Sequence, residues 1–201
     1  MSRVNRDDID KFHDYSLYIP QRTIYIGSEY TDDSGESGVD AAMAARVIKN
    51  LTILDTLSAE AITIIMNNPG GDVNHGLAIY DAIRACRSEI TIKIFGHAMS
   101  MGSIILQAGD VRIMSENSSQ MIHYGGLGVD KEAKTVYKIV EEFKRIDKWM
   151  EKMYLKKIHE KQPQYSLSRL KGQLSHDTFL TAQQSVEMGL ADKVLGEEHE
   201  E

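Results

Sequence analysis

Two consecutive units of strand, open turn and helix constrain this chain more than any other feature. In the first, the β-branched run 61–66 ends in Asn-Asn-Pro-Gly-Gly at 67–71, and a helix is expected over 76–86. In the second, the run 90–95 leads through Gly-His-Ala-Met-Ser to a helix expected over 101–108. Open turns at the carboxyl ends of neighbouring parallel strands form a ligand crevice. The pattern therefore predicts an α/β fold with a binding site at this edge of a sheet.

Strand and helix alternate along the rest of the chain as well. Further strands are expected at 23–26, 111–114 and 120–123, and a first helix from Asp40 to about Leu54. This order predicts a mainly parallel sheet with right-handed crossovers.

A long amphipathic helix is expected from about Asp130 to Glu160. Its apolar residues recur at three- and four-residue spacing, and a helix of about 30 residues spans about 45 Å. The apolar stripe is explained either by packing along the chain's own sheet or by contact with a second copy. The stripe comprises Val136, Ile139, Val140, Phe143, Ile146, Met150 and Met153.

Ser100 falls at the turn between the strand 90–95 and the following helix. There the helix dipole favours developing negative charge, as a nucleophile requires, although a serine at this position is also a common N-cap. The nearby Gly70-Gly71 lets backbone N–H groups approach a ligand, as an oxyanion hole requires. From position alone, Ser100 remains open to both interpretations.

A serine hydroxyl becomes a good nucleophile when an imidazole takes its proton and a carboxylate orients that imidazole. Of the seven histidines, His123 is the candidate base, because it ends an apolar strand just before a glycine-rich stretch. His97 is interpreted as structural and His75 as a solvated residue of a turn.

Asp177 is the candidate acid. It precedes Phe179 and Leu180, which we expect to anchor it against the core. From the local sequence alone, Asp177 is better explained as the N-cap of a helix that begins near Thr181.

Composition narrows the functional classes. A chain of 201 residues suits one domain, and a net charge of −7 with a pI near 5.5 argues against nucleic-acid binding. One cysteine excludes an internal disulfide and a cysteine-based metal site. The polar N-terminus and the absence of a long apolar run lead us to expect a cytoplasmic protein without membrane contact.

The chain resembles the proteolytic subunit of the ATP-dependent Clp protease, from about Tyr15 to Leu195. The resemblance rests on motifs in the family's order. They are Asn68-Pro69-Gly70-Gly71 with Gly76-Leu77-Ala78-Ile79-Tyr80-Asp81, Ala98-Met99-Ser100-Met101-Gly102-Ser103, Met121-Ile122-His123, Asp177-Thr178-Phe179-Leu180-Thr181-Ala182 and Glu187-Met188-Gly189-Leu190-Ala191-Asp192-Lys193-Val194.

The resemblance implies a crotonase/ClpP-like fold of the α/β class, a superhelix of repeated β-β-α units. It implies an N-terminal arm at 1–14, a protease domain at 15–195 with a projecting handle helix at about 130–160, and an acidic disordered tail at 196–201.

It also implies a serine peptidase site. Ser100 would be the nucleophile, His123 the general base and Asp177 the residue that orients the histidine. The backbone N–H groups of Gly71 and Met101 would form the oxyanion hole.

The family's activity is hydrolysis of unfolded polypeptides and short peptides inside two stacked heptameric rings, fed by an AAA+ unfoldase. The resemblance thus implies a homo-oligomer without a cofactor of its own, with ATP used by the partner. This chain departs from the family at Thr63 and Ile65 on the ATPase-docking surface, at Tyr124-Gly125 after the histidine, and at Ser175-His176.

Two other functional classes stay open from the sequence. A crotonase-type acyl-CoA enzyme shares the fold and a backbone oxyanion hole but has no need of the serine–histidine pair. A non-catalytic ring or scaffold subunit is expected to have lost a triad residue, and here all three are present.

Overall fold

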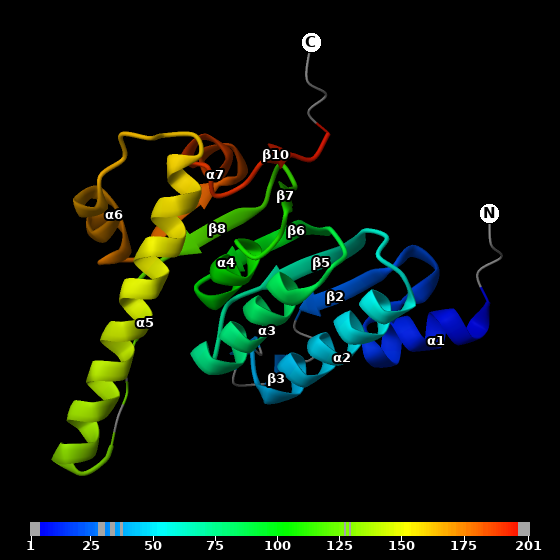
Figure 1. Cartoon of the computed structure of the whole chain (residues 1–201), viewed down its shortest axis with the longest axis horizontal. Coiled ribbons are helices and arrows are strands. Elements are labelled where there is room, and N and C mark those ends of the chain that lie inside the picture. The colour runs from blue at the N-terminus through cyan, green and yellow to red at the C-terminus, as the bar shows by residue number, and fades with distance from the viewer. Residues whose placement is uncertain are drawn as a thin grey trace.

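The computed structural model describes residues 5–27, 31–32, 35–36, 38–126, 128 and 130–196. Within these residues, eight strands form one sheet in the order β1-β2-β5-β6-β7-β10, and β8 and β9 extend it beside β6 (Figure 1). The strands of this sheet are β1 (Leu17–Tyr18), β2 (Thr23–Gly27), β5 (Ile62–Asn68), β6 (Ile90–Met99), β7 (Val111–Met114), β8 (Ser119–Ile122), β9 (Thr178–Thr181) and β10 (Lys193–Val194). The short strands β3 (Thr31–Asp32) and β4 (Gly35–Glu36) pair separately.

Helices connect the strands and cover the sheet. They are α1 (Arg6–Tyr15), the 3-10 turn η1 (Ile19–Gln21), α2 (Ala41–Leu57), α3 (Val73–Ala85), α4 (Met101–Leu106), α5 (Ala133–His159), α6 (Leu167–Leu174) and α7 (Ala182–Met188). Strands β2, β5, β6 and β7 run parallel, with α2, α3 and α4 as their crossovers. The expected α/β class with a mainly parallel sheet is confirmed.

Strand β5 shows why these segments form a buried sheet. Its residues alternate between fully buried and partly buried positions, with Ile62, Ile64 and Met66 on the buried face. Side chains of successive strand residues point to opposite faces, so this apolar face packs into the core. Helices α2 and α3 lie side by side over the sheet (Figure 1).

Strand β6 continues beyond the predicted run 90–95 because it changes partners at Gly96. Residues before the glycine pair with β7, and His97 to Met99 pair with β8. Gly96 has φ +90°, and a Cβ there would lie 2.5 Å from the side-chain oxygen of Asn67. A residue without a Cβ is therefore required where the strand bends from one partner to the other.

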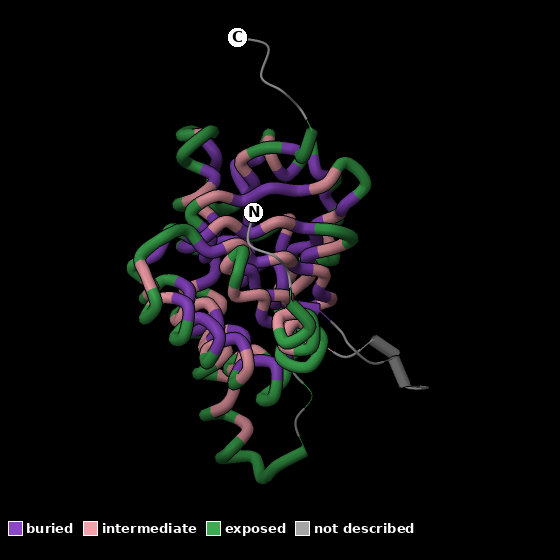
Figure 2. The backbone as a smooth tube through the Cα atoms, turned by 90° about the vertical axis from the view of Figure 1, so that its right-hand side faces the viewer, coloured by how far each residue is buried: buried purple, intermediate pink, exposed green. Residues whose placement is uncertain are grey.

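Helix α5 matches the predicted long helix and extends well beyond the sheet (Figure 1). Its second half packs on the core through Met150, Met153 and Tyr154. Its first half has no buried residue, and Figure 2 shows exposure concentrated at this outer end. The apolar stripe is thus divided between an inner part in the chain's own core and an outer part at the surface.

The structure describes most of the N-terminal arm but almost none of the C-terminal tail. Helix α1 occupies most of the expected N-terminal arm, starts at a capping box between Asn5 and Asp8, and packs Phe12 against Tyr18 with ring centroids 6.1 Å apart. The expected acidic tail lies outside the described residues, apart from Gly196. Across the described part of the chain, no helix combines the length and apolarity that a bilayer span needs.

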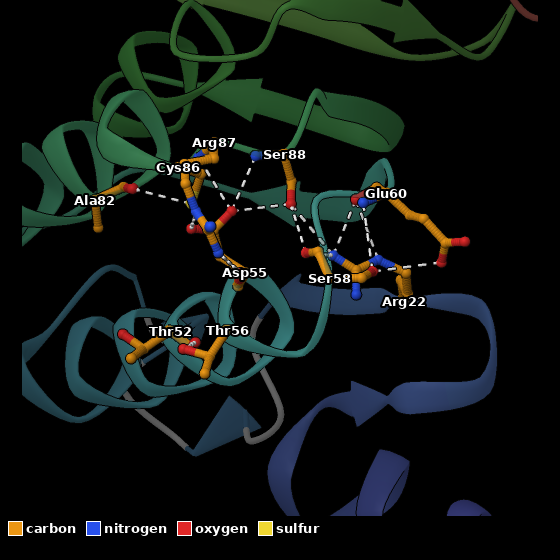
Figure 3. Close-up of polar contacts among 10 residues, drawn as sticks. All are labelled: Arg22, Thr52, Asp55, Thr56, Ser58, Glu60, Ala82, Cys86, Arg87 and Ser88. Carbon is orange, nitrogen blue, oxygen red and sulfur yellow. Dashed lines mark hydrogen bonds and ion pairs between the residues drawn. The ribbon is translucent and has the colours of Figure 1, made fainter.

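At the amino ends of the strands, polar side chains join the loops together (Figure 3). Asp55 at the end of α2 accepts hydrogen bonds from the backbone N–H groups of Arg87 and Ser88, at 3.0 and 2.9 Å, and from the Ser88 hydroxyl. The backbone bond from Ser88 is the main reason that the pKa of Asp55 is lowered to about 2. Arg22 donates to the carbonyl groups of Ser58 and Glu60, at 3.1 and 2.9 Å.

Candidate active site

Ser100 is held in an unusual backbone conformation between β6 and α4. Its φ is +50° and its ψ is −118°, and its backbone N–H donates to the carbonyl of Met121 at 2.9 Å. A non-glycine residue in such a conformation costs about 1–3 kcal/mol and is found where surrounding structure enforces it, often at functional sites. The side chain makes no capping bond to α4. Ser100 thus occupies the N-cap position of α4, as the alternative interpretation has it, but its side chain does not act as the cap.

The Ser100 hydroxyl lies in a hydrogen-bonded chain with the predicted base and acid. Ser100 Oγ is 2.8 Å from Nε2 of His123, and Nδ1 of the same ring is 2.8 Å from Oδ1 of Asp177. The side chain of His123 is 24% exposed, so the ring is largely enclosed. The three residues that the sequence singled out are thus brought together.

Pairing of β8 with β9 explains how His123 and Asp177, which are 54 positions apart in the sequence, come into contact. Ile122 lies opposite Thr178 in this antiparallel pair, so His123 and Asp177, the next residue outward on each strand, are neighbours. Thr181, and not Asp177, is the N-cap of α7, so the capping interpretation of Asp177 is wrong. The expected anchoring is correct for Leu180, which is buried, and wrong for Phe179, which is 59% exposed.

The glycine turn after β5 lies directly against Ser100. Gly70 has φ +109°, and a Cβ on it would lie 2.7 Å from Cβ of Ser100 and 3.2 Å from the backbone nitrogen of Met101. Gly71 has φ +138°, and a Cβ there would lie 2.3 Å from the backbone nitrogen of Val39. These contacts leave no room for a side chain on either glycine. Because Gly70 contacts both Ser100 and Met101, the turn that carries Gly71 adjoins the turn that carries Met101, and these are the two predicted oxyanion donors.

The extended segment at Val39 fixes this glycine turn. Val39 N–H donates to the carbonyl of Gly70 at 2.6 Å, and Asp72 N–H donates to the carbonyl of Val39 at 2.8 Å. Asp72 then caps α3 by accepting from the backbone N–H of His75 at 2.9 Å. His75 thus lies in the first turn of α3, and its predicted placement in a solvated turn is wrong.

Two neighbouring cavities open beside the triad, and both use α5 as a wall. The first adjoins Ser100 and is mostly apolar. It is lined by Val73, Leu77, Ser100, Met101, Ile104, His123, Gly125, Phe143, Ile146, Asp147 and Met150. The second, of about 420 Å³, shares Val73, Phe143 and Ile146 and continues along the glycine turn to Asn74. The two cavities meet along these shared residues and form a recess from Ser100 toward the outer half of α5, which is apolar beside Ser100 and partly polar at Asp72, Asn74 and Glu142.

Apart from Ser100, Met101, His123 and the glycine turn, the sequence did not assign these lining residues to the site. The stripe Phe143, Ile146 and Met150 has helical spacing, which signals a buried face but does not say what that face covers. His97, interpreted as structural, lies within β6 opposite Ser119.

Comparison with known proteins agrees with this architecture. The sequence matches the Clp protease family over residues 10–198. It is 31% identical over 189 residues to the ATP-dependent Clp protease proteolytic subunit of Deinococcus radiodurans, an alignment that covers 92% of this chain and 86% of that protein. Because the match spans nearly the whole chain, including both turns and both strands of the site, the chain belongs to the Clp protease family.

Proposed function

We propose that this protein is a serine endopeptidase that hydrolyses unfolded polypeptides and short peptides. The observation that carries the proposal is the pair of 2.8 Å contacts linking Ser100, His123 and Asp177. This arrangement matches what a triad needs: a nucleophile bonded to its base, and a base bonded to the group that orients it.

The roles follow from the chemistry of acyl transfer. Ser100 Oγ attacks the peptide carbonyl while His123 Nε2 takes its proton, and Asp177 keeps the proton on Nδ1 and stabilises the imidazolium. The N–H groups of Gly71 and Met101 receive the oxyanion, a contribution worth about 10²–10³ in rate for each donor. His123 then protonates the leaving amine, and water releases the acyl group by the reverse sequence.

The recess beside Ser100 supports an extended peptide as the substrate. It runs between the glycine turn and α5, and its walls are apolar side chains such as Leu77, Ile104 and Met150. An apolar wall next to the nucleophile binds a substrate side chain through burial of its surface. A folded protein presents no such free strand, so we expect selection for unfolded chains.

The outer half of α5 supports assembly with further copies. Val136, Ile139, Val140 and Phe143 are only partly covered within the chain, and Tyr137 is 72% exposed. In this proposal the outer half joins two heptameric rings into a closed tetradecameric chamber. An AAA+ unfoldase feeds the chamber and uses the ATP, so this chain needs no cofactor of its own. The particle works in the cytoplasm and binds neither nucleic acid nor a membrane.

The chemistry is tested with a short fluorogenic peptide, an unfolded protein and a folded protein as substrates. Wild-type protein should hydrolyse the first two and spare the third, and Ser100→Ala should abolish hydrolysis. Hydrolysis that persists in Ser100→Ala would exclude this nucleophile. Thioester hydrolysis without peptide hydrolysis would instead favour the crotonase-type alternative, and no hydrolysis at all would favour a scaffold subunit.

Assembly is tested by sedimentation of Val140→Glu, with Lys138→Glu as a control on an exposed position of the same helix. Burying an unpaired carboxylate between rings is strongly unfavourable, so Val140→Glu should shift the particle toward half its mass. Lys138→Glu should sediment as wild type. A wild-type protein that is active as a monomer would contradict the chamber.

A further inference from the structure

A third cavity, between α3 and α5, lies apart from the triad. Its volume is about 290 Å³, and it shares no lining residue with the two cavities beside Ser100. This volume is close to the lower end of the range for small-molecule sites, about 300–1,000 Å³. Cations and aromatic rings dominate its lining, which includes Tyr80, Arg84, Trp149, Lys152, Lys156 and Lys157.

Two of the four cations at this cavity have partners within the fold. Arg84 forms an ion pair of 2.9 Å with Asp110. Nζ of Lys157 lies 3.8 Å from Oε1 of Glu160, a long contact for an ion pair, although the Lys157 side chain is only 21% exposed. Burial, followed by repulsion from Arg112, lowers the pKa of Lys157. An anion in the cavity would compensate this partly desolvated charge.

The other two cations, Lys152 and Lys156, lie one helical turn apart on α5. Both residues are exposed, and within the part of the chain that the structure describes neither ammonium group has a hydrogen bond or an ion pair. Two uncompensated positive charges therefore reach the same cavity as the half-buried Lys157. Like charges at this spacing repel one another, so the cavity attracts anions.

Two aromatic rings form the apolar part of the cavity wall. Tyr80 of α3 and Trp149 of α5 meet edge to face, with ring centroids 5.1 Å apart and an angle of 87° between the ring planes. An apolar wall beside a few charged groups is typical of small-molecule sites. Trp149 is also the only tryptophan of the chain, so tryptophan fluorescence reports on this cavity.

A phosphate group suits this cluster of ammonium groups better than a carboxylate. A phosphate ester carries a charge of about −1.5 to −2 near pH 7 and has three strong acceptor oxygens, so it can bind several lysines at once. We propose that the cavity binds a small molecule with two or more phosphate groups, held by Lys152, Lys156 and Lys157. The site does not depend on the proposed peptidase reaction, because its residues lie outside the cavities beside Ser100.

The test titrates the wild-type protein with pyrophosphate at constant ionic strength, by calorimetry and by Trp149 fluorescence. We expect binding heat and a change in emission with the same midpoint. Lys152→Gln/Lys156→Gln should weaken the affinity about tenfold, because two charges that bind the ligand are removed. Lys144→Gln/Lys148→Gln is the matched control. It removes two charges, also four residues apart, from exposed positions of α5 outside the cavity, and should bind as the wild type does.

Three results would overturn the proposal. The first is the absence of binding heat at millimolar pyrophosphate. The second is binding that both double variants weaken equally, or that neither weakens, since the attraction would then come from overall charge or from another site. The third is binding heat without a change in Trp149 emission, because the ligand would then lie elsewhere.

A parallel titration with adenosine diphosphate identifies the source of the phosphate groups. Its base can reach the aromatic wall formed by Tyr80 and Trp149, so tighter binding than pyrophosphate would assign the cavity to a nucleoside diphosphate. Equal affinity for the two compounds would assign it to the linked phosphate groups alone. Either result supports the proposed site, provided that Lys152→Gln/Lys156→Gln weakens the binding.

Discussion

At the carboxyl ends of β5 and β6 the chain turns through Gly70, Gly71 and Ser100, all with positive φ. At the amino ends of the same strands, the loops are held by side chains such as Asp55 and Arg22, which bond to backbone groups of neighbouring loops (Figure 3). One end of the sheet thus carries the strained Ser100 beside a glycine turn, and the other is held by charge-assisted hydrogen bonds.

This difference shows how one sheet supports both stability and chemistry. Hydrogen bonds to charged groups contribute about 1.5–3 kcal/mol each when well formed, and less where water competes. Strained turns cost free energy but keep backbone N–H groups free to meet a substrate. We therefore expect changes at the carboxyl end to act mainly on activity and changes at the amino end mainly on stability.

The largest separation of activity from stability is expected for Asp177→Asn. The amide no longer holds the proton on Nδ1 of His123, and the corresponding change in serine proteases lowers kcat about 10⁴-fold. The Asp177 side chain is 60% exposed, so the melting temperature should change little. Peptide hydrolysis measures the activity and calorimetry on the same sample measures the melting temperature. A large fall in melting temperature would contradict the separation of activity from stability.

Gly70→Ala should reduce both peptide hydrolysis and the stability of the fold. The new Cβ would lie 2.7 Å from Cβ of Ser100, in a conformation that side chains rarely adopt. Displacement of Ser100 or of the oxyanion turn should lower kcat about 100-fold or more. Hydrolysis at a wild-type rate would show that the turn is not coupled to Ser100.

Asp55→Asn should affect stability and leave peptide hydrolysis unchanged. The pKa of Asp55 is lowered from 3.8 to about 2 in the folded chain, so the ionised carboxylate stabilises the fold. That contribution is fully present above pH 4 and is lost as the pH falls through 2. Urea unfolding at several pH values measures the free energy of unfolding. This free energy should be higher for the wild type than for the variant at pH 7, and the two values should converge near pH 2. A difference independent of pH would contradict this role.

The smallest effect is expected for Gly172→Ala in the last turn of α6. A Cβ there meets no atom within 4 Å, so the variant gains helix propensity without a clash. Stability should rise by about 0.5–1 kcal/mol with unchanged kcat. It also serves as the matched control for Gly70→Ala, because both add one methyl group to a glycine.

The parts of the site that could be predicted are those encoded within one strand and its turn. Ser100 follows a buried strand and His123 ends another, so their strand pattern placed both at one sheet edge. The glycine turn was equally visible, because Pro-Gly-Gly follows a β-branched run. Such features depend on neighbours in sequence, and short patterns report them well.

The remaining parts depend on contacts between distant segments. Asp177 is adjacent to His123 only because β9 pairs with β8, and its local sequence favours a helix cap instead. Asp147 faces the cavity only because α5 packs beside Ser100. Neither the pairing nor the packing has a signal in the residues nearby, so the sequence could not reveal them.

The strained turn at Ser100 presents a nucleophile that His123 activates. Reaction with a fluorophosphonate, followed by intact mass and peptide mapping, measures this directly. We expect one adduct per chain on Ser100 in the wild type, and labelling slowed by several orders of magnitude in His123→Ala, because triad residues act as a unit. A wild-type protein that stays unlabelled, or a His123→Ala variant labelled at the wild-type rate, would contradict the claim.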